Sequence, residues 1–154
     1  LVNTYLPRAY AEPEDIEARA QMLAAAAMGA TAFQKGLGAI HALSHPIGAV
    51  FNTHHGTTNA VVAPAVLTFN RPAVEDRLAA AAAYLGIQGG FDGFFARVEE
   101  LNASLGIPAK LSDMGVDPSR IDELVPMALA DPSVGGNPVA MTAENTRDLF
   151  LAAM

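Results

Sequence analysis

Residues 36–59 read GLGAIHALSHPIGAVFNTHHGTTN and contain all four histidines of the chain. His41 and His45 are four residues apart, so on a helix they lie on one face, one turn from each other. His54 and His55 follow a break in the helical pattern, and the glycine after them suits a tight turn before another helix. Such an arrangement is one way to converge imidazoles on a metal ion. The competing interpretation is a set of hydrogen-bonded core histidines.

The two helices that carry these histidines are expected to differ in character. We expect the first to cover residues 37–50 and to kink at Pro46, which lacks an N–H and crowds the carbonyl one turn before it. The second is apolar on nearly all sides up to about Phe69, which predicts a buried helix. Its N-cap is expected to be one of three residues: Thr57, Thr58 or Asn59.

Proline and glycine divide the rest of the chain into further helices. We find no internal repeat, no βαβ unit and no glycine-rich dinucleotide fingerprint. An alanine-rich helix from Pro13 to about Phe33 is expected to lie buried in the core. Pro72 is expected to start a separate helix after a break at residues 70–71. Three more helices are expected to begin near residue 91, at Pro118 and after Thr142, and the fold class is all-α.

Composition excludes several classes of protein. The 154 residues are enough for one domain with a core, and the hydrophobic fraction is 51%. The net charge of −7 has no basic stripe within it, which argues against nucleic acid and anionic membranes as partners. No apolar run approaches the ~20 residues that span a bilayer. Cysteine is absent and the first ten residues do not read as a signal peptide, so we expect a cytoplasmic protein.

The histidine stretch resembles the iron-containing (group III) alcohol dehydrogenases. The resemblance extends to essentially the whole chain through residues 137–139 and the final helix. It implies a multihelical domain like the C-terminal domain of dehydroquinate synthase-like and iron-containing alcohol dehydrogenases. The residues that carry it are Gly36-Leu37-Gly38, His41-x-x-x-His45-Pro46, Gly48, His55-Gly56, Asn59-Ala60 and Pro64.

The resemblance implies a role for three of the histidines. In that family the residues matching His41 and His55 bind the catalytic metal, and the one matching His45 lies beside it, near the nicotinamide and the substrate. We therefore expect His41 and His55 to be metal ligands and His45 to be the catalytic and cofactor-contacting residue. His54 has no consistent counterpart and is expected at the rim. The implied cofactors are Fe(II), or zinc or another divalent metal, and NAD or NADP.

Two residues before the histidines are further candidates. Phe33 and Leu37 come just ahead of His41 and are expected either to pack in the core or to line a substrate pocket.

The implied reaction is the reversible oxidation of an alcohol to an aldehyde or ketone by NAD(P), with the metal as Lewis acid. Two imidazoles are too few for a catalytic metal site. The family adds an aspartate and a histidine four residues apart on an earlier helix, and an N-terminal nucleotide-binding domain. We find neither in this chain. We therefore interpret residues 1–154 as the C-terminal helical metal-binding domain of a longer protein, inactive by itself.

The expected partners are a small alcohol or aldehyde and the protein's own N-terminal domain, and homo-oligomerisation is left open. Two alternative functions also stay open. One is a non-catalytic helical module for assembly or metal sensing. The other is an enzyme like the maleylacetate reductases, which commonly carry a cysteine near the second histidine, where this chain has Leu43-Ser44-His45.

Overall fold

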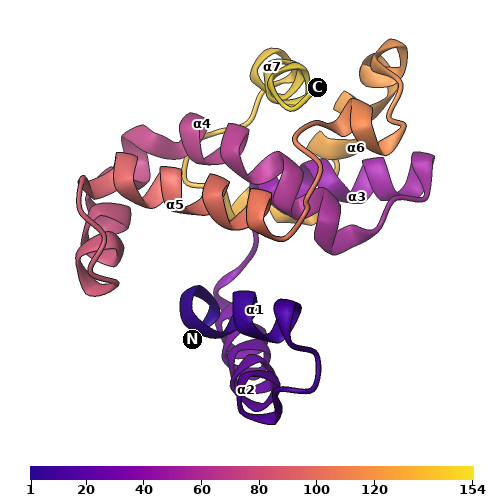
Figure 1. Ribbon diagram of the computed structural model, residues 1–154. Coiled ribbons are helices and arrows are strands. Elements are labelled where there is room, and N and C mark those ends of the chain that lie inside the picture. The colour runs from indigo at the N-terminus through magenta and orange to yellow at the C-terminus, as the bar shows by residue number, and fades with distance from the viewer.

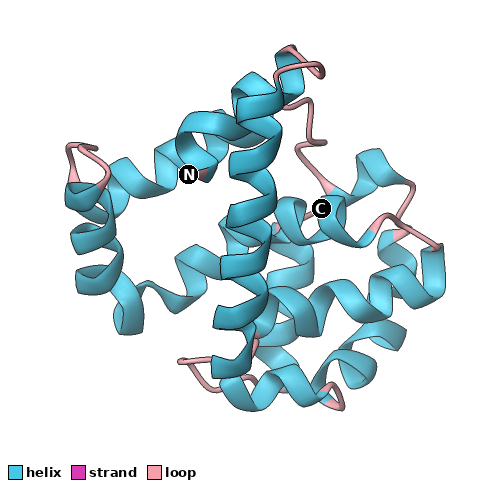
Figure 2. Cartoon of the chain, turned by 90° about the horizontal axis from the view of Figure 1, so that it is seen from below, coloured by secondary structure: helices cyan, strands magenta, loops and turns pink.

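The computed structural model describes residues 1–154, and all of its regular structure is helical, which confirms the predicted fold class (Figures 1 and 2). None of the helices combines the length and the apolar character needed to cross a membrane. Four short 3₁₀ helices connect the longer ones: η1 (Phe33–Lys35), η2 (Leu111–Met114), η3 (Pro118–Arg120) and η4 (Pro132–Gly136). The α-helices are α1 (Val2–Ala11), α2 (Ile16–Ala32), α3 (Ala39–Phe51), α4 (His55–Tyr84), α5 (Gly90–Ser104), α6 (Ile121–Leu129) and α7 (Ala143–Ala152).

The hydrophobic core lies where α3, α4, α6 and α7 meet, on the right of Figure 1. Each of these helices turns an apolar stripe inward, and burying one such side chain is worth about 1.5–3 kcal/mol. The fully buried side chains include Leu43 and Ile47 on α3, Val62 on α4, Leu124 on α6 and Phe150 on α7. The inner side of α3 is therefore packed in the core, and this packing fixes the position of the helix that carries His41 and His45.

Helix α4 is one continuous helix of 30 residues, so the predicted break at residues 70–71 and the separate helix from Pro72 were wrong. A proline inside a helix leaves one carbonyl without its N–H partner, four residues earlier. For Pro64 that carbonyl belongs to Ala60, and the Asn102 amide on α5 donates to it at 3.0 Å. Packing against α5 thus supplies a hydrogen bond that the helix itself lacks at Pro64. Just before Pro72, Asn70 donates to Asn137 at 2.9 Å and Arg71 donates to Asp92 of α5 at 2.8 Å, so tertiary contacts hold the helix at the expected break as well.

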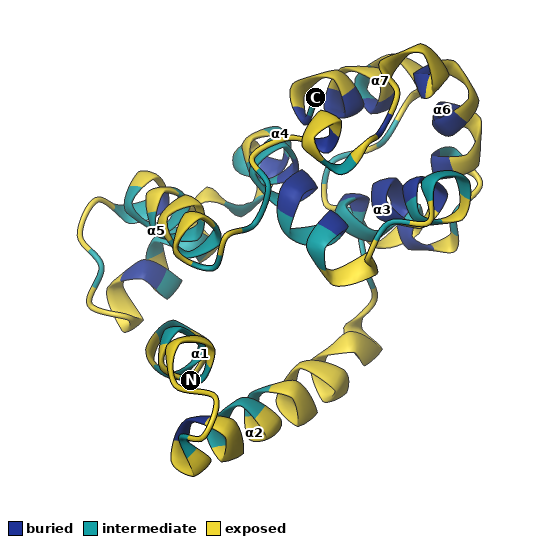
Figure 3. Cartoon of the chain, turned by 45° about the vertical axis from the view of Figure 1, so that its right-hand side comes forward, coloured by how far each residue is buried: buried dark blue, intermediate teal, exposed yellow.

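Helix α2 is mostly exposed, so the prediction of a buried core helix was also wrong. Figure 3 shows most of α2 in the colour of exposed residues. Ala18 is its only buried residue, whereas Ile16 and Leu23 are each 74% exposed and Met28 is 65% exposed. Helices α1 and α2 form a pair that lies apart from the core (Figure 1). The apolar pattern of α2 is real, but apart from η1 the only element that packs extensively against it in this chain is α1.

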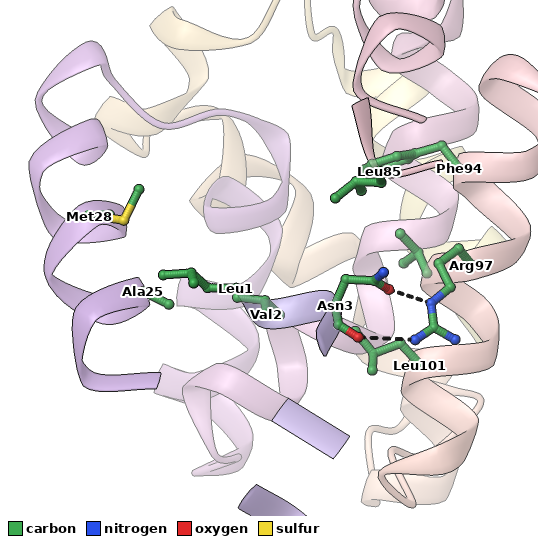
Figure 4. A pocket seen from close by; sticks show the side chains of 10 residues that line it. Leu1, Val2, Asn3, Ala25, Met28, Leu85, Phe94, Arg97 and Leu101 are labelled. Carbon is green, nitrogen blue, oxygen red and sulfur yellow. Dashed lines mark hydrogen bonds between the residues drawn. The ribbon is translucent and has the colours of Figure 1, made fainter. Parts of the chain in front are cut away.

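The contact between α1 and α5 also supplies a donor to a backbone carbonyl that a proline leaves without its helical N–H. Pro7 leaves the Asn3 carbonyl without its helical N–H, and Arg97 of α5 donates to that carbonyl at 3.4 Å and to the Asn3 side chain (Figure 4). Beside this contact lies an apolar groove of about 410 Å³ between α1, α2 and α5. Its lining includes Met28 and Phe94 (Figure 4).

Candidate metal centre

Three histidine rings meet at the junction of α3 and α4. His41 and His45 lie one turn apart on α3, and His55 is the first residue of α4. The ring centroids of His41 and His45 are 5.6 Å apart, and the His55 centroid is 5.3 Å from each of them. The structure thus brings together the three histidines that the sequence singled out, in a nearly equilateral triangle.

The fourth histidine, His54, caps helix α4 and stands outside this triangle. The Thr57 backbone N–H donates to His54 Nδ1 at 3.2 Å, and the Thr57 hydroxyl lies 3.1 Å from the same atom. The expected cap at Thr57, Thr58 or Asn59 was therefore wrong, because the imidazole nitrogen takes the acceptor role that serine, threonine or aspartate usually fills. His54 is exposed, and its ring belongs to the helix end.

The position of His41 depends on how α3 begins. Gly38, the N-cap, has no side chain to accept a hydrogen bond, and the Ala39 N–H donates instead to Asn137 Oδ1 at 3.1 Å. Asn137 and Asn70 exchange two amide hydrogen bonds, of 2.9 and 2.8 Å. This amide pair ties the start of α3 to α4 and to the segment after η4, and so fixes the turn that carries His41.

Two glycines make that close approach sterically feasible. A Cβ added at Gly38 would lie 2.9 Å from Asn137 Oδ1, and one added at Gly136 would overlap the carbonyl oxygen of Leu37. Gly135, in contrast, has open space where a Cβ would stand. The contact between residues 36–38 and the end of η4 therefore requires glycine at 38 and 136.

Asn59 of α4 joins two of the three rings. Its Nδ2 lies 3.3 Å from His41 Nε2 and 3.1 Å from His55 Nε2. Because an amide nitrogen only donates, both Nε2 atoms are placed as acceptors of the Asn59 amide. The two Nε2 atoms are thus turned toward one point.

The third ring, His45, is held by a carboxylate. His45 Nδ1 lies 2.7 Å from Asp131 Oδ2, and the second oxygen of Asp131 accepts the Ser133 N–H at 2.8 Å and caps η4. In the sequence, Asp131 is followed by Pro132 and Ser133. Its local signal, Asp-Pro-Ser, identifies a helix cap, and nothing in it points to a histidine 86 residues away.

Burial and neighbouring charges shift two pKa values at this site. Partial burial raises the pKa of Asp131, but the hydrogen bonds from Ser133 and His45 outweigh that effect and leave the pKa below its usual value. Partial burial lowers the pKa of His41, and positive charge on His55 or His45 lowers it further. His41 is therefore held in the neutral form, which is the form that binds metals.

Phe33 and Leu37 both lie beside His41. The Phe33 ring meets the His41 ring edge-on at 5.4 Å and is 52% exposed, so it is not a core residue. Leu37 and His41 line a cavity of about 340 Å³ together with apolar side chains of α4. An apolar cavity beside a polar cluster is typical of small-molecule sites.

The donor set fits a transition metal in part. Imidazole suits Fe(II), Zn(II), Ni(II) and Co(II). Two Nε2 atoms already face one point, and the buried oxygen Oδ1 of Asn59 beside them has no hydrogen-bond partner. No group of three or more His, Cys, Asp or Glu side chains in the chain is placed to hold a metal ion. The chain thus presents part of a metal site: two nitrogen ligands and, beside them, a buried oxygen, Asn59 Oδ1, that has no hydrogen-bond partner.

Comparison with known proteins identifies relatives over the full length of the chain. Residues 1–154 match the family model described as "Fe-containing alcohol dehydrogenase family, C-terminal". The 4-hydroxybutyrate dehydrogenase of Cupriavidus necator is 37% identical, over 97% of this chain and 41% of its own length.

Two crystal structures have the same fold. A 1,3-propanediol oxidoreductase superposes with a TM-score of 0.94 at 28% identity, over 99% of this chain and 42% of that one. The maleylacetate reductase of Rhizobium sp. strain MTP-10005 superposes with a TM-score of 0.82 at 29% identity, over 99% and 42%. The chain thus spans about two fifths of the length of these relatives.

Proposed function

The chain belongs to the iron-containing alcohol dehydrogenase family, and on that premise we propose that it is the C-terminal part of an NAD(P)-linked alcohol dehydrogenase. The enzyme would interconvert a small alcohol and an aldehyde or ketone. The observation that carries this proposal is the convergence of the His41 and His55 Nε2 atoms on one point, with the His45 ring 5.6 and 5.3 Å from theirs.

We propose that His41 and His55 hold a divalent metal through Nε2. Iron is the first choice because the family is iron-containing, and zinc or another divalent metal suits the same ligands. When bound, the metal would supply a Lewis acid for the substrate oxygen, and NAD(P) a hydride acceptor. Burial lowers the pKa of His41 and so favours its neutral form, which is the form that binds metals.

His45 is proposed as the residue that orients the substrate and moves its proton. Asp131 accepts the Nδ1–H of His45, which leaves Nε2 free for a substrate hydroxyl. The His45 side chain is 42% exposed, so small molecules can reach it. A positioned acid or base of this kind contributes typically about 10²–10⁴-fold to a reaction rate.

The remaining parts of the enzyme are proposed to lie outside residues 1–154. The chain spans about two fifths of its relatives' length, and it presents only part of a metal site. We propose that an N-terminal nucleotide-binding domain and two more ligands complete the centre. The exposed apolar side chains of α2, such as Leu23 and Met28, form the surface on which that remainder would pack.

A second candidate is a maleylacetate reductase, favoured by the fold shared with the Rhizobium enzyme. The absence of cysteine near His45 weighs against it.

One experiment separates these proposals. The full-length protein is loaded with Fe(II) or Zn(II) without oxygen, and NAD(P) reduction is followed with a panel of short alcohols and 4-hydroxybutyrate. NAD(P)H oxidation is followed with the aldehydes and with maleylacetate. Alcohol-dependent turnover that requires metal supports the proposal. Reduction of maleylacetate alone supports the second candidate, and a protein that binds metal but turns over nothing is a non-catalytic module.

A further inference from the structure

Asn59 lies between the two proposed metal ligands and has no role in the proposed reaction as described above. It lies one turn after His55 on α4, and α4 packs against α3, which carries His41. Its Nδ2 is within hydrogen-bond distance of both Nε2 atoms, at 3.1 and 3.3 Å. One amide thus orients two rings that come from two helices.

The other end of the same amide is unusual. Asn59 Oδ1 is buried and has no hydrogen-bond partner. A buried acceptor without a partner is costly, and native proteins retain few of them. Asn59 therefore presents an oxygen that lacks a donor or a cation, next to a pair of nitrogen ligands.

Metal binding has a direct consequence for Asn59. Each Nε2 has one lone pair, and a metal bound there takes the lone pair that now accepts from the Asn59 amide. The amide must then release both rings. The torsion between Cβ and Cγ of asparagine is broad and roughly two-fold, so half a turn exchanges the places of Nδ2 and Oδ1. The N–H groups then take the buried place where Oδ1 has no partner, and the attraction between Oδ1 and the cation has to exceed that cost.

We propose that Asn59 is a positioning residue of the metal centre. Its Nδ2 holds the His41 and His55 Nε2 atoms in convergence before the metal binds, and its Oδ1 then turns toward the cation. The turned oxygen gains a positive neighbour, and no N–H remains facing the metal. This inference rests on the proposed function, because it requires His41 and His55 to bind metal.

The test measures the affinity of the full-length protein for Co(II) and for Zn(II) with three side chains of similar size at position 59: the wild-type asparagine, leucine and aspartate. Asn59→Leu removes both polar atoms, and Asn59→Asp keeps an oxygen and adds a negative charge. Outer partners of metal ligands typically change metal affinity by about 10–100-fold. We expect Asn59→Leu to bind each metal about 10–100-fold more weakly than wild type, and Asn59→Asp to bind more tightly than wild type. The absorption spectrum of bound Co(II) is expected to change in Asn59→Asp.

A matched control is Asn102→Leu, which removes an amide that also supports α4, by donating to the Ala60 carbonyl. It is expected to lower the melting temperature and to leave metal affinity unchanged. If Asn59→Leu binds metal as tightly as wild type, or more tightly, Asn59 is a structural residue or a mere competitor, and the inference is wrong. If Asn59→Leu does not fold, Asn59→Asp decides, and binding no tighter than wild type overturns the inference. A wild-type protein that binds no metal refutes the proposed function itself.

Discussion

His45 Nδ1 lies 2.7 Å from Asp131 Oδ2, although the two residues are 86 positions apart in the chain. The carboxylate accepts the Nδ1–H and so orients the ring, which is stacked on the His55 ring with centroids 5.3 Å apart. Asp131 also caps η4 through Ser133, so one side chain links the histidine triangle to the segment that precedes Asn137.

Asp131→Asn in the full-length enzyme is expected to keep the fold and the bound metal but to lower kcat by about 10–100-fold. Asparagine caps a helix as well as aspartate does, whereas it no longer offers a negative charge to the His45 N–H. His45→Gln is expected to lose about 10²–10⁴-fold in kcat, again with metal content near that of wild type. Metal analysis and steady-state kinetics on the same preparations give both quantities.

The chain contains a matched control for this change. Asp117-Pro118-Ser119 repeats the Asp-Pro-Ser sequence and the same capping bond, at 2.8 Å, and no histidine lies near it in the hydrogen-bond network. Asp117→Asn is expected to leave kcat unchanged. Equal losses in Asp117→Asn and Asp131→Asn would show that the caps matter and the histidine contact does not. Metal lost in proportion to activity in His45→Gln would make His45 a ligand.

His41→Ala and His55→Ala are each expected to abolish turnover and to lower the bound metal well below one per chain, because each removes one Nε2 donor. His54→Ala removes only the cap of α4 and is expected to cost about 0.5–2 kcal/mol of stability, with metal content retained. Metal content by elemental analysis and melting curves separate the two effects. Loss of metal in His54→Ala with His55→Ala unaffected would exchange the roles of these neighbours.

The convergence of three histidines was predictable from sequence because it follows from local geometry. His41 and His45 share a helix face by their spacing, and His55 begins the next helix after a short turn. Their chemical roles stay predictions that rest on the family. Phe33 and Leu37 were left between the core and a pocket, and the structure places both beside His41.

The predictions that failed depended on residues distant in sequence. Helix α4 continues through Pro72, where Asn70 pairs with Asn137 and Arg71 with Asp92 of α5, and no local pattern reveals these contacts. Asp131 meets His45 only in the folded chain. The apolar pattern of α2 predicted burial, but such a pattern does not say which surface covers the helix, and Leu23 is 74% exposed.

Gly136→Ala is expected to weaken both the fold and the metal site. The added Cβ would overlap the Leu37 carbonyl, and overpacking of this kind costs about 1–3 kcal/mol. Relief requires residues 36–38 to move, which shifts the start of α3 and with it His41. Gly135→Ala is the control, because open space surrounds that position. Melting temperature and Zn(II) affinity are expected to fall together in Gly136→Ala and to stay at wild-type values in Gly135→Ala; equal behaviour of the two variants would contradict this account.

The lowered pKa of His41 predicts how stability depends on pH. Its ordinary pKa is 6.5, and burial followed by the charges of His55 and His45 lowers that value in the folded protein. As the pH falls through 6.5, the unfolded chain takes up the His41 proton before the folded chain does. The unfolded state therefore binds more protons in this range, and the free energy of unfolding decreases as the pH is lowered.

The carboxyl groups whose pKa values are shifted do not affect this measurement, because folding lowers those pKa values from 3.8 and the pH range of the measurement lies above them. Melting curves at pH 7.5 and 5.5, with a chelator present, are compared for wild type and His41→Gln, which cannot take up a proton at this position. We expect wild type to lose more of its melting temperature on acidification than His41→Gln does. An equal loss in both proteins would mean that His41 keeps its ordinary pKa in the fold, and that burial at the junction of α3 and α4 does not hold it neutral for a metal.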